Sequence, residues 1–500
     1  MRSMDPRTPA VLGAALAVGA AGDLLLRGGA LGVGFTMWAW GALVVYLALS
    51  RRMRVLFAGD VLPFAVLAFI CSGLVAVRAS PTLSALNICA TLTAATLLSL
   101  RTRAVSLRKA PVLDYIQGVA TVALDAATGA FGPVAGALAH VTTGMPNARS
   151  RGLALTRGAL LTMPALVFFG ILFLAADASF ERLVVDIMTA DAWTPANHLF
   201  MVAGITLVFA GVFHRSLTAR RDESADPRSA GSSSLGLVEA GMLVGALDLL
   251  FAAFVALQIP HFFGGSWTLA STPGLTAAEY ARRGFFELIL VEAVAVPILL
   301  GAEAIVRSKG GRDVTAFRIL AGINLGLLGA IAASAALRLL LYRSAFGLTE
   351  TRVYVGAVLV WLVAVLVILA LTVLTGRHER FAFAAIIAGF AVLFALNAAN
   401  PDGLIASTNL ARAEKGASVD AGNTGGSFDV AYNSRLSADA LPTLLAGLDS
   451  LGRADKMRLA ELLQQRQVSS GAAGWRSWNL ARQRARSASY RLKISAMLIR

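Results

Sequence analysis

The chain has 500 residues, of which 57% are hydrophobic and only 15% are charged, and its formal net charge is +15. Soluble domains carry about 25% charged residues, so this composition argues against a soluble enzyme and indicates a protein with many membrane-crossing helices. The basic residues stand in short clusters between apolar runs, a pattern typical of topology signals, so nucleic acid is not an expected partner.

Apolar runs long enough to cross a bilayer, which takes about 20 residues, recur along most of the chain. They lie at 8–26, 30–50, 56–77, 81–100, 156–175, 195–214, 235–259, 284–305, 315–338, 353–374 and 380–398. Helices satisfy their own backbone groups without water, so runs of this length predict helices. The expected fold is therefore all-α, a polytopic bundle of about 11 transmembrane helices with a small helical C-terminal tail. We interpret the first run as an uncleaved helix, although its basic start resembles a signal peptide.

Composition divides the chain into four parts. Residues 1–110 hold the N-terminal spans, and residues 155–400 hold the core spans, with a flexible Gly/Ser-rich linker near 216–234. Residues 111–154 are apolar but broken by Gly and Pro, which indicates an interfacial or re-entrant segment on the cytoplasmic side. Residues 401–500 have helical periodicity and lower hydropathy, so we expect a soluble helical tail.

Clusters of Arg and Lys follow every second span, and such clusters stay in the cytoplasm. They stand near residues 51–54, 101–109 together with 149–151, 215–228, 307–312 and 377–380. This pattern predicts an N-terminus inside and, with eleven spans, a tail outside. If residues 111–146 crossed the membrane, every later loop would change side and the pattern would fail.

The usual catalytic patterns are missing from the sequence, including a P-loop, HExxH, GxSxG and a dinucleotide fingerprint. The five histidines are scattered without metal-ligand spacing. Cys71 and Cys89 both fall inside apolar runs, and we interpret them as buried thiols. We therefore predict no catalytic residue, no metal site and no cofactor, and an enzyme is the less favoured class.

Carboxyl side chains inside the apolar runs indicate a functional site more clearly than the histidines and cysteines do. A charge at mid-bilayer costs at least about 2.5–3.5 kcal/mol, so it must be paired, neutralised or hydrated. Asp248 lies near the middle of the seventh run and Glu292 lies within the eighth. Consecutive antiparallel helices can place these two carboxyls near one another, and two close carboxyls tend to share one proton.

Other polar residues lie at related depths. Glu287, near the outer interface, has Arg338 as its candidate partner, and Glu303, nearer the inside, has Arg318. The set supports a proton or cation relay, or else structural ties between helices, which contribute about 0.6 kcal/mol each. The candidate site comprises Asp248, Glu287, Glu292, Glu303, Arg318, Asn324 and Arg338.

The end of the tail is strongly basic. Residues 475–500 hold seven Arg or Lys residues and no acidic residue. Such a segment can bind an anionic lipid surface or an acidic partner, or can be a solvated helix. Apart from the lipid bilayer itself, the sequence points to no other partner and does not indicate an oligomeric state.

Several stretches, in order, resemble a bacterial polytopic membrane family known only as a domain of unknown function, of the 4173/4153 type. They are "RGLALTRGALLTMPALVFFGILFLAAD", "LDLLFAAFVALQIPHFFGG", "EYARRGFFEL", "LLLYRSAFGLTETRVY", "NPDGLIASTNLARA", "LSADALPTLL" and "WRSWNLAR". The resemblance covers roughly residues 80–490 and implies a bacterial cytoplasmic membrane protein without an established activity. Asp248 departs from the family pattern, where an uncharged polar residue is expected.

Two functions from different classes follow from these features. The buried carboxyls favour a transporter or permease, which would need a water-accessible site at mid-membrane. The missing catalytic set and the helical tail favour a membrane-embedded sensor or assembly factor that acts through the tail. An intramembrane enzyme is less favoured, because no nucleophile or metal set accompanies the carboxyls. The substrate is not indicated.

Overall fold

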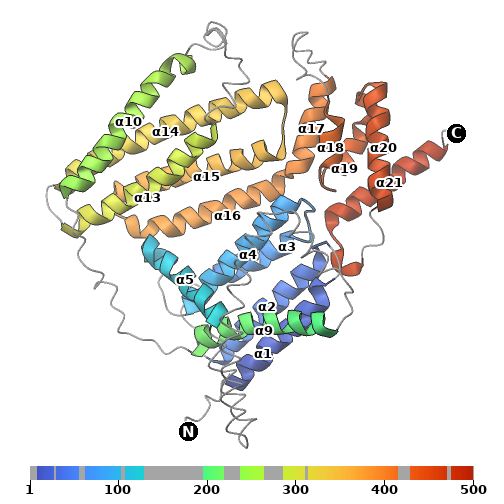
Figure 1. The fold of residues 1–500 in the computed structure, drawn as a ribbon, viewed down its shortest axis with the longest axis horizontal. Coiled ribbons are helices and arrows are strands. Elements are labelled where there is room, and N and C mark those ends of the chain that lie inside the picture. Colours follow the sequence, from blue (N-terminus) through green and yellow to red (C-terminus); the bar gives the residue numbers. More distant parts are fainter. Residues whose placement is uncertain are drawn as a thin grey trace, which may run out of the picture. The chain divides into compact units, whose positions relative to one another are not determined.

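The structure is a computed structural model that describes residues 8–27, 30–53, 55, 62–102, 107–128, 195–218, 237–263, 285–309, 313–414, 428–469 and 474–498. Every regular element in these ranges is a helix, and no strand occurs among them (Figure 1). The predicted all-α fold is therefore confirmed.

The chain forms two compact units. Unit 1 comprises Met1–Leu107, Leu113–Asp222 and Ser470–Gln483, and unit 2 comprises Arg108–Val112, Glu223–Ser469 and Arg484–Arg500. The chain passes from unit 1 to unit 2 after Asp222, within the predicted linker near 216–234. Most of this linker lies outside the described residues. The other boundaries differ from the four-part division by composition, because these units are groups of segments that pack together wherever they stand in the chain.

Unit 1 is built from apolar helices that pack side by side. α1 packs along α9, α2 contacts α1 and α3, and α3 packs on α4. A small core of Phe35, Ala39 and Val75 joins α2 to the end of α3. The helices are α1 (Thr8–Leu26), α2 (Val33–Arg52), α3 (Leu62–Leu74), α4 (Pro81–Thr102), η1 (Leu107–Lys109), α5 (Val112–Thr128) and α9 (Pro195–Thr218), with η6 (Trp475–Ser477) and the start of α21 (Leu480–Leu498).

Gly211 on α9 marks a close approach between two helices of unit 1. A Cβ at this position would lie 2.1 Å from the backbone oxygen of Asp125 on α5, whereas Gly204 on the same helix has nothing within 4 Å. We expect Gly211→Ala to destabilise the protein by about 1–3 kcal/mol through overpacking. Gly204→Ala should be neutral or stabilising by up to about 1 kcal/mol, because Ala is the better helix former. Denaturant unfolding in detergent measures both, and equal effects would contradict the close approach.

Unit 2 is a helix bundle followed by a group of shorter helices. α14 contacts α10, α13 and α15, and α16 packs on α15. The elements are α10 (Leu237–Phe263), α13 (Phe285–Lys309), α14 (Asp313–Phe346), α15 (Glu350–Val373), η3 (His378–Arg380), α16 (Phe381–Ala399), α17 (Pro401–Glu414), α18 (Val430–Arg435), α19 (Leu441–Ala446), η5 (Leu448–Ser450) and α20 (Arg453–Ser469).

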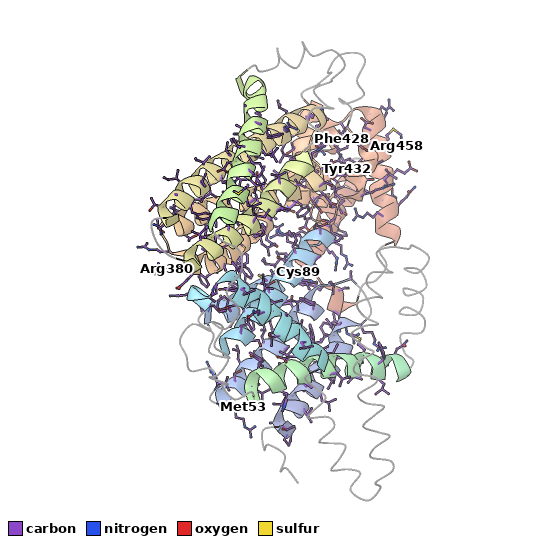
Figure 2. All side chains as sticks on the ribbon, turned by 60° about the vertical axis from the view of Figure 1, so that its left-hand side comes forward. Met53, Cys89, Arg380, Phe428, Tyr432 and Arg458 are labelled. Atoms are coloured by element: carbon purple, nitrogen blue, oxygen red, sulfur yellow. The ribbon has the colours of Figure 1, made fainter. Side chains whose placement is uncertain are left out.

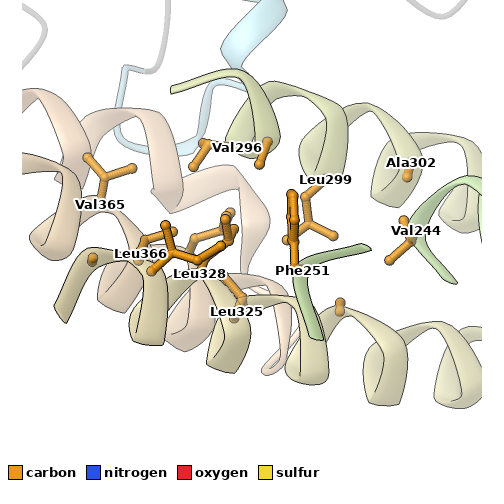
Figure 3. Close-up of a cluster of buried hydrophobic side chains, with 14 of the residues drawn as sticks. Val244, Phe251, Val296, Leu299, Ala302, Leu325, Leu328, Val365 and Leu366 are labelled. Atoms are coloured by element: carbon orange, nitrogen blue, oxygen red, sulfur yellow. The ribbon is translucent and has the colours of Figure 1, made fainter. Parts of the chain in front are cut away.

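The core of the bundle is formed by interlocking aliphatic and aromatic side chains. Phe251 of α10, Leu299 of α13, Leu328 of α14 and Leu366 of α15 all belong to it (Figure 3). Lipid tails are as apolar as these side chains, so close packing rather than exclusion of water holds such helices together. A polar group placed within this core therefore meets few partners unless a neighbouring helix supplies one.

Seven helices among the described residues are long and apolar enough to cross a membrane. They correspond to the predicted runs 8–26, 30–50, 81–100, 195–214, 315–338, 353–374 and 380–398. Runs 56–77 and 235–259 contain shorter apolar helices, run 284–305 forms α13 without joining the seven, and run 156–175 lies outside the described residues. The predicted count of about 11 is thus not confirmed, while the membrane class is supported.

The short helices α17–α20 enclose an apolar core of their own, which we call the tail core. Ile405, Leu444 and Leu459 are large side chains that are fully buried in it, and Leu348, from the α14–α15 connection, joins them. Phe428 and Tyr432 lie among these helices (Figure 2). The tail core is therefore built on the bundle of unit 2, at the end where α14 stops and α15 begins.

Candidate functional site

Two side chains of the predicted site meet inside the bundle of unit 2. Asp248 on α10 and Asn324 on α14 are both buried, and Asn324 Nδ2 donates a 2.8 Å hydrogen bond to Asp248 Oδ1. The second oxygen of Asp248, Oδ2, is buried without a hydrogen-bond partner among the described residues. The pair ties α10 to α14 and leaves one carboxyl oxygen available.

The strength of this tie can be measured with a double-mutant cycle. We expect Asp248→Ala, Asn324→Ala and the double variant to give a coupling energy of about 0.6–1.7 kcal/mol, the range found for hydrogen bonds between membrane helices. Unfolding of the purified protein in detergent supplies the four free energies. A coupling energy of zero would contradict the hydrogen bond.

Glu292 on α13 is the most isolated polar group of the bundle. Its side chain is 0% exposed, and neither carboxyl oxygen has a hydrogen-bond partner within the part of the chain that the structure describes. Ala295, Val296 and Leu299 of the same helix belong to the apolar core. The sequence predicts Asp248 as the neighbour of Glu292, but the hydrogen-bond partner of Asp248 is Asn324. A carboxyl in such surroundings can hold a proton or accept a cation.

The structure does not bring all of the predicted site residues together. Arg338 is buried on α14 and Glu303 is partly buried on α13, whereas Arg318 is exposed and its Nη2 atom lies beside Gly376. The side chain of Glu287 lies outside the described residues. The two proposed ion pairs therefore stay predictions. Among the described residues, no three His, Cys, Asp or Glu side chains could hold a metal ion.

Sequence analysis missed a second polar group, at the junction of the tail core with α15, which we call the tail joint. Asp402 and Asp439 are both buried there. Asp402 Oδ2 accepts a 3.1 Å hydrogen bond from the Ser437 backbone N–H, and Ser437 Oγ donates to Asp439 Oδ2 at 3.3 Å. Two carboxyl groups are thus held by one serine.

Local backbone chemistry places Asp402 at this position. α16 ends at Asn400, which adopts a left-handed conformation with φ 53°, and Asn tolerates that conformation better than most residues. Pro401 then opens α17, because its missing N–H is not needed at a first helical position. Asp402 in the first turn benefits from the positive end of the helix dipole.

The first residue of α15 completes the tail joint. Burial and the neighbouring Asp402 carboxyl raise the pKa of the Glu350 carboxyl. The backbone N–H of Glu350 donates a 2.7 Å hydrogen bond to the Tyr432 hydroxyl. Asn409 joins α17 to the α14–α15 connection, since its side chain bonds both the N–H and the oxygen of Leu348, at 3.0 and 3.1 Å.

Arg466 of α20, an exposed residue, is one of the cations beside the tail joint. Its Nη1 donates to the backbone oxygens of Ser434, at 3.0 Å, and Leu436, and its charge acts on Asp402. Burial raises the pKa of the Asp402 carboxyl, and hydrogen bonds from Ser437 oppose this shift, while the nearby Asp439 adds to it. The tail joint therefore favours a protonated Asp402 more than water does.

Unit 1 holds a smaller polar cluster that sequence reasoning also missed. Asp23 of α1 accepts a 2.6 Å hydrogen bond from Arg27 Nη2 and lies 2.6 Å from His198 Nδ1 of α9. Asp23 lies inside the first apolar run, and a carboxyl in that position was the sequence signal that could have located this cluster. The cluster links the ends of two helices that pack along each other.

Comparison with protein families identifies the family of the chain. A family model described as a domain of unknown function, DUF4153, matches residues 64–447. The chain belongs to the DUF4153 family. No curated protein and no solved structure matches it. The suspected family is thereby confirmed, and the DUF4153 match covers Glu292, the Asp248–Asn324 pair and most of the tail joint.

Three stretches that carry the DUF4153 resemblance converge on the tail joint. "LLLYRSAFGLTETRVY" supplies Glu350, "NPDGLIASTNLARA" supplies Asp402 and Asn409, and "LSADALPTLL" supplies Ser437 and Asp439. The shared family resemblance of these three stretches was the available signal, since nothing in their local composition marks the tail joint.

Proposed function

We propose that this protein is a permease-like multi-pass membrane protein, in which Glu292 serves as a buried acceptor for a proton or a small cation. The observation that carries the proposal is the burial of both Glu292 oxygens without a hydrogen-bond partner among the described residues. A leucine would fill such a position without the cost of burying a carboxyl. A function in binding a proton or a cation therefore explains the carboxyl better than a role in packing does.

The surroundings of Glu292 support the same function. α13 contacts α10, α14 and α15, so its carboxyl is enclosed by helices rather than by lipid. The Asp248–Asn324 pair holds α10 and α14 together and leaves the Asp248 Oδ2 atom without a partner among the described residues. The bundle thus contains two carboxyls with capacity to bind a proton or a cation.

The proposed setting is a bacterial cytoplasmic membrane, with the N-terminus inside and the tail outside. The basic clusters after alternate spans support this orientation. The tail core and the α14–α15 connection share one end of unit 2, so both belong on the same side of the membrane, which agrees with the proposed orientation.

Water accessibility of position 292 tests the proposal. A single cysteine is placed there in a variant that lacks Cys71 and Cys89, and is treated with a small membrane-impermeant thiol reagent. We expect labelling at position 292 and none at position 299, a matched control at a buried apolar residue of the same helix. A folded protein that stays unlabelled at 292 would make Glu292 a structural feature of a closed bundle.

A second function is a membrane-embedded sensor or assembly factor that acts through the tail, and the polar tail joint favours it. Because the pKa of Asp402 is raised on folding, its proton stabilises the folded tail, and this contribution is lost as pH rises above the ordinary Asp value of 3.8 toward the raised value. We expect stronger amide protection in α17–α20 at low pH, after correction for intrinsic exchange, and a weaker pH dependence in Asp402→Asn. An unchanged pH dependence in that variant would contradict this role for Asp402.

A further inference from the structure

The face of α13 that carries Glu292 offers very few oxygen atoms to a bound ion. Positions three, four and seven residues away lie on the same face of a helix, and here they hold apolar residues of the core or packed against it, Ile289, Ala295, Val296 and Leu299. The two carboxyl oxygens of Glu292 are buried and have no hydrogen-bond partner among the described residues. This face therefore offers an ion little beyond the carboxyl group itself.

The backbone beside Glu292 supplies no further ligand. Sodium sites of transporters take carbonyl oxygens from interrupted helices, whereas α13 is continuous from Phe285 to Lys309. Pro297 inside it leaves the Ala293 carbonyl without its usual helical donor. Ala293 and Pro297 are both exposed, so this oxygen lies on a different side of the helix from the buried Glu292. The carbonyl therefore does not add to the carboxyl site.

The neighbouring helices do not neutralise Glu292 either. α10, α14 and α15 contact α13. Their described titratable and charged side chains are Asp248, Arg318, Arg338, Arg343, Glu350, Arg352 and Tyr354. None of these side chains hydrogen-bonds to Glu292, since neither of its oxygens has a partner among the described residues. The charge of an ionised Glu292 would thus stay uncompensated, which apolar surroundings strongly disfavour.

Asp248 on α10 has a similar environment. Asn324 Nδ2 donates a 2.8 Å hydrogen bond to its Oδ1 atom, and its Oδ2 atom is buried without a partner among the described residues. The amide N–H occupies the side of Oδ1 that a cation would need. Asp248 therefore presents one available oxygen, whereas protein sites hold calcium or magnesium with about six or more oxygen ligands.

We propose that the ion taken up by this bundle is a proton rather than a metal cation, and that Glu292 and Asp248 each carry it as a neutral carboxyl group. The inference rests on the proposed function and names its ion. A hydronium ion gives its proton to one carboxyl oxygen and leaves as water, so one O–H bond forms and the buried charge disappears. Release to water reverses the step. A proton needs only one oxygen, which each site can supply.

Infrared difference spectroscopy of the purified full-length protein tests the proposal, because a neutral carboxyl group has a carbonyl band that a carboxylate lacks. At neutral pH we expect one such band to be lost in Glu292→Gln and another in Asp248→Asn. Both variants keep the size of the side chain and replace the carboxyl by an amide. The matched control, Glu461→Gln at an exposed position of α20, should leave both bands unchanged.

Transfer to deuterated water adds a second readout. Both bands should move to lower frequency, because a proton that the protein takes up and releases must exchange with solvent. An unaltered spectrum in Glu292→Gln, or a band that does not exchange, overturns the proposal. If Glu292→Gln does not fold, Glu292→Asp serves instead, since it keeps a carboxyl and should shift the band rather than remove it.

Sodium is the opposing probe. A cation that binds the folded protein raises its stability, so we expect equal thermal unfolding in sodium chloride and in choline chloride at the same concentration. A sodium-dependent rise in Tm that Glu292→Gln abolishes would identify a metal cation and overturn the proposal.

Cysteine labelling at position 292 separates this inference from the proposed function. Labelling together with sodium-dependent stabilisation would support the permease and overturn the proton as its ion. An exchangeable carboxyl band without labelling would support proton binding by Glu292 and count against the aqueous path that a permease needs.

Discussion

Glu292→Met should fold, be more stable than the wild type by about 1–3 kcal/mol, and lose the proposed transport. The carboxyl is fully buried without a hydrogen-bond partner among the described residues, so its burial opposes folding by about that amount. Methionine is similar in size and adapts to irregular core space. Denaturant unfolding in detergent measures the stability, and acidification of proteoliposomes loaded with a pH-sensitive dye measures proton entry.

A control on the same helix separates the carboxyl from general repacking. Leu299 is a fully buried member of the core, and Leu299→Ala should destabilise the protein by about 2–5 kcal/mol through the cavity that it leaves. A loss of stability in Glu292→Met of more than about 1 kcal/mol would show that the carboxyl holds the bundle together. Unchanged proton entry in this variant would count against Glu292 as the acceptor.

Arg466→Ala should destabilise the tail by about 1.5–3 kcal/mol. The substitution leaves the oxygens of Ser434 and Leu436 without their donor and removes the cation that acts on Asp402. Hydrogen bonds from a charged group contribute about this much, and because Arg466 is exposed, the larger cost of uncovering a buried charge does not apply. Hydrogen exchange of α17–α20 measures the loss locally, and denaturant unfolding measures the total.

The surface of the same helix offers a control of the same kind. Lys456 of α20 pairs with Asp449 at 2.5 Å, but the Asp449 side chain is 90% exposed. Lys456→Ala should therefore cost less than about 1 kcal/mol. If both substitutions had similar effects, the buried network of the tail joint would contribute no more than a surface ion pair.

The pairing of the buried polar residues could be predicted only in part. Asp248, Glu292 and Asn324 were recognisable because polar residues stand out in apolar runs, and the structure buries all three. Their partners were not recognisable. Asp248 pairs with Asn324, which stands 76 positions later in the chain, and the choice depends on how each helix is rotated about its axis.

The tail joint shows a different limit of sequence reasoning. Its carboxyls, Glu350, Asp402 and Asp439, stand in short polar stretches whose composition suggests ordinary loops and helix ends. Nothing local distinguishes them from exposed residues. Folding of α17–α20 against the start of α15 buries Asp402 and Asp439, partly buries Glu350 and gives the two aspartates a common partner in Ser437.

Helical class and most span positions were readable from residue order alone, since a bilayer requires long apolar segments and such segments must be helical. These requirements act on each segment separately and do not depend on how the helices pack together. The burial of Glu292 without a hydrogen-bond partner among the described residues, and the serine that joins Asp402 to Asp439, follow from contacts between distant segments. Tertiary packing decided them, because burial and hydrogen-bond partners are properties of a three-dimensional neighbourhood.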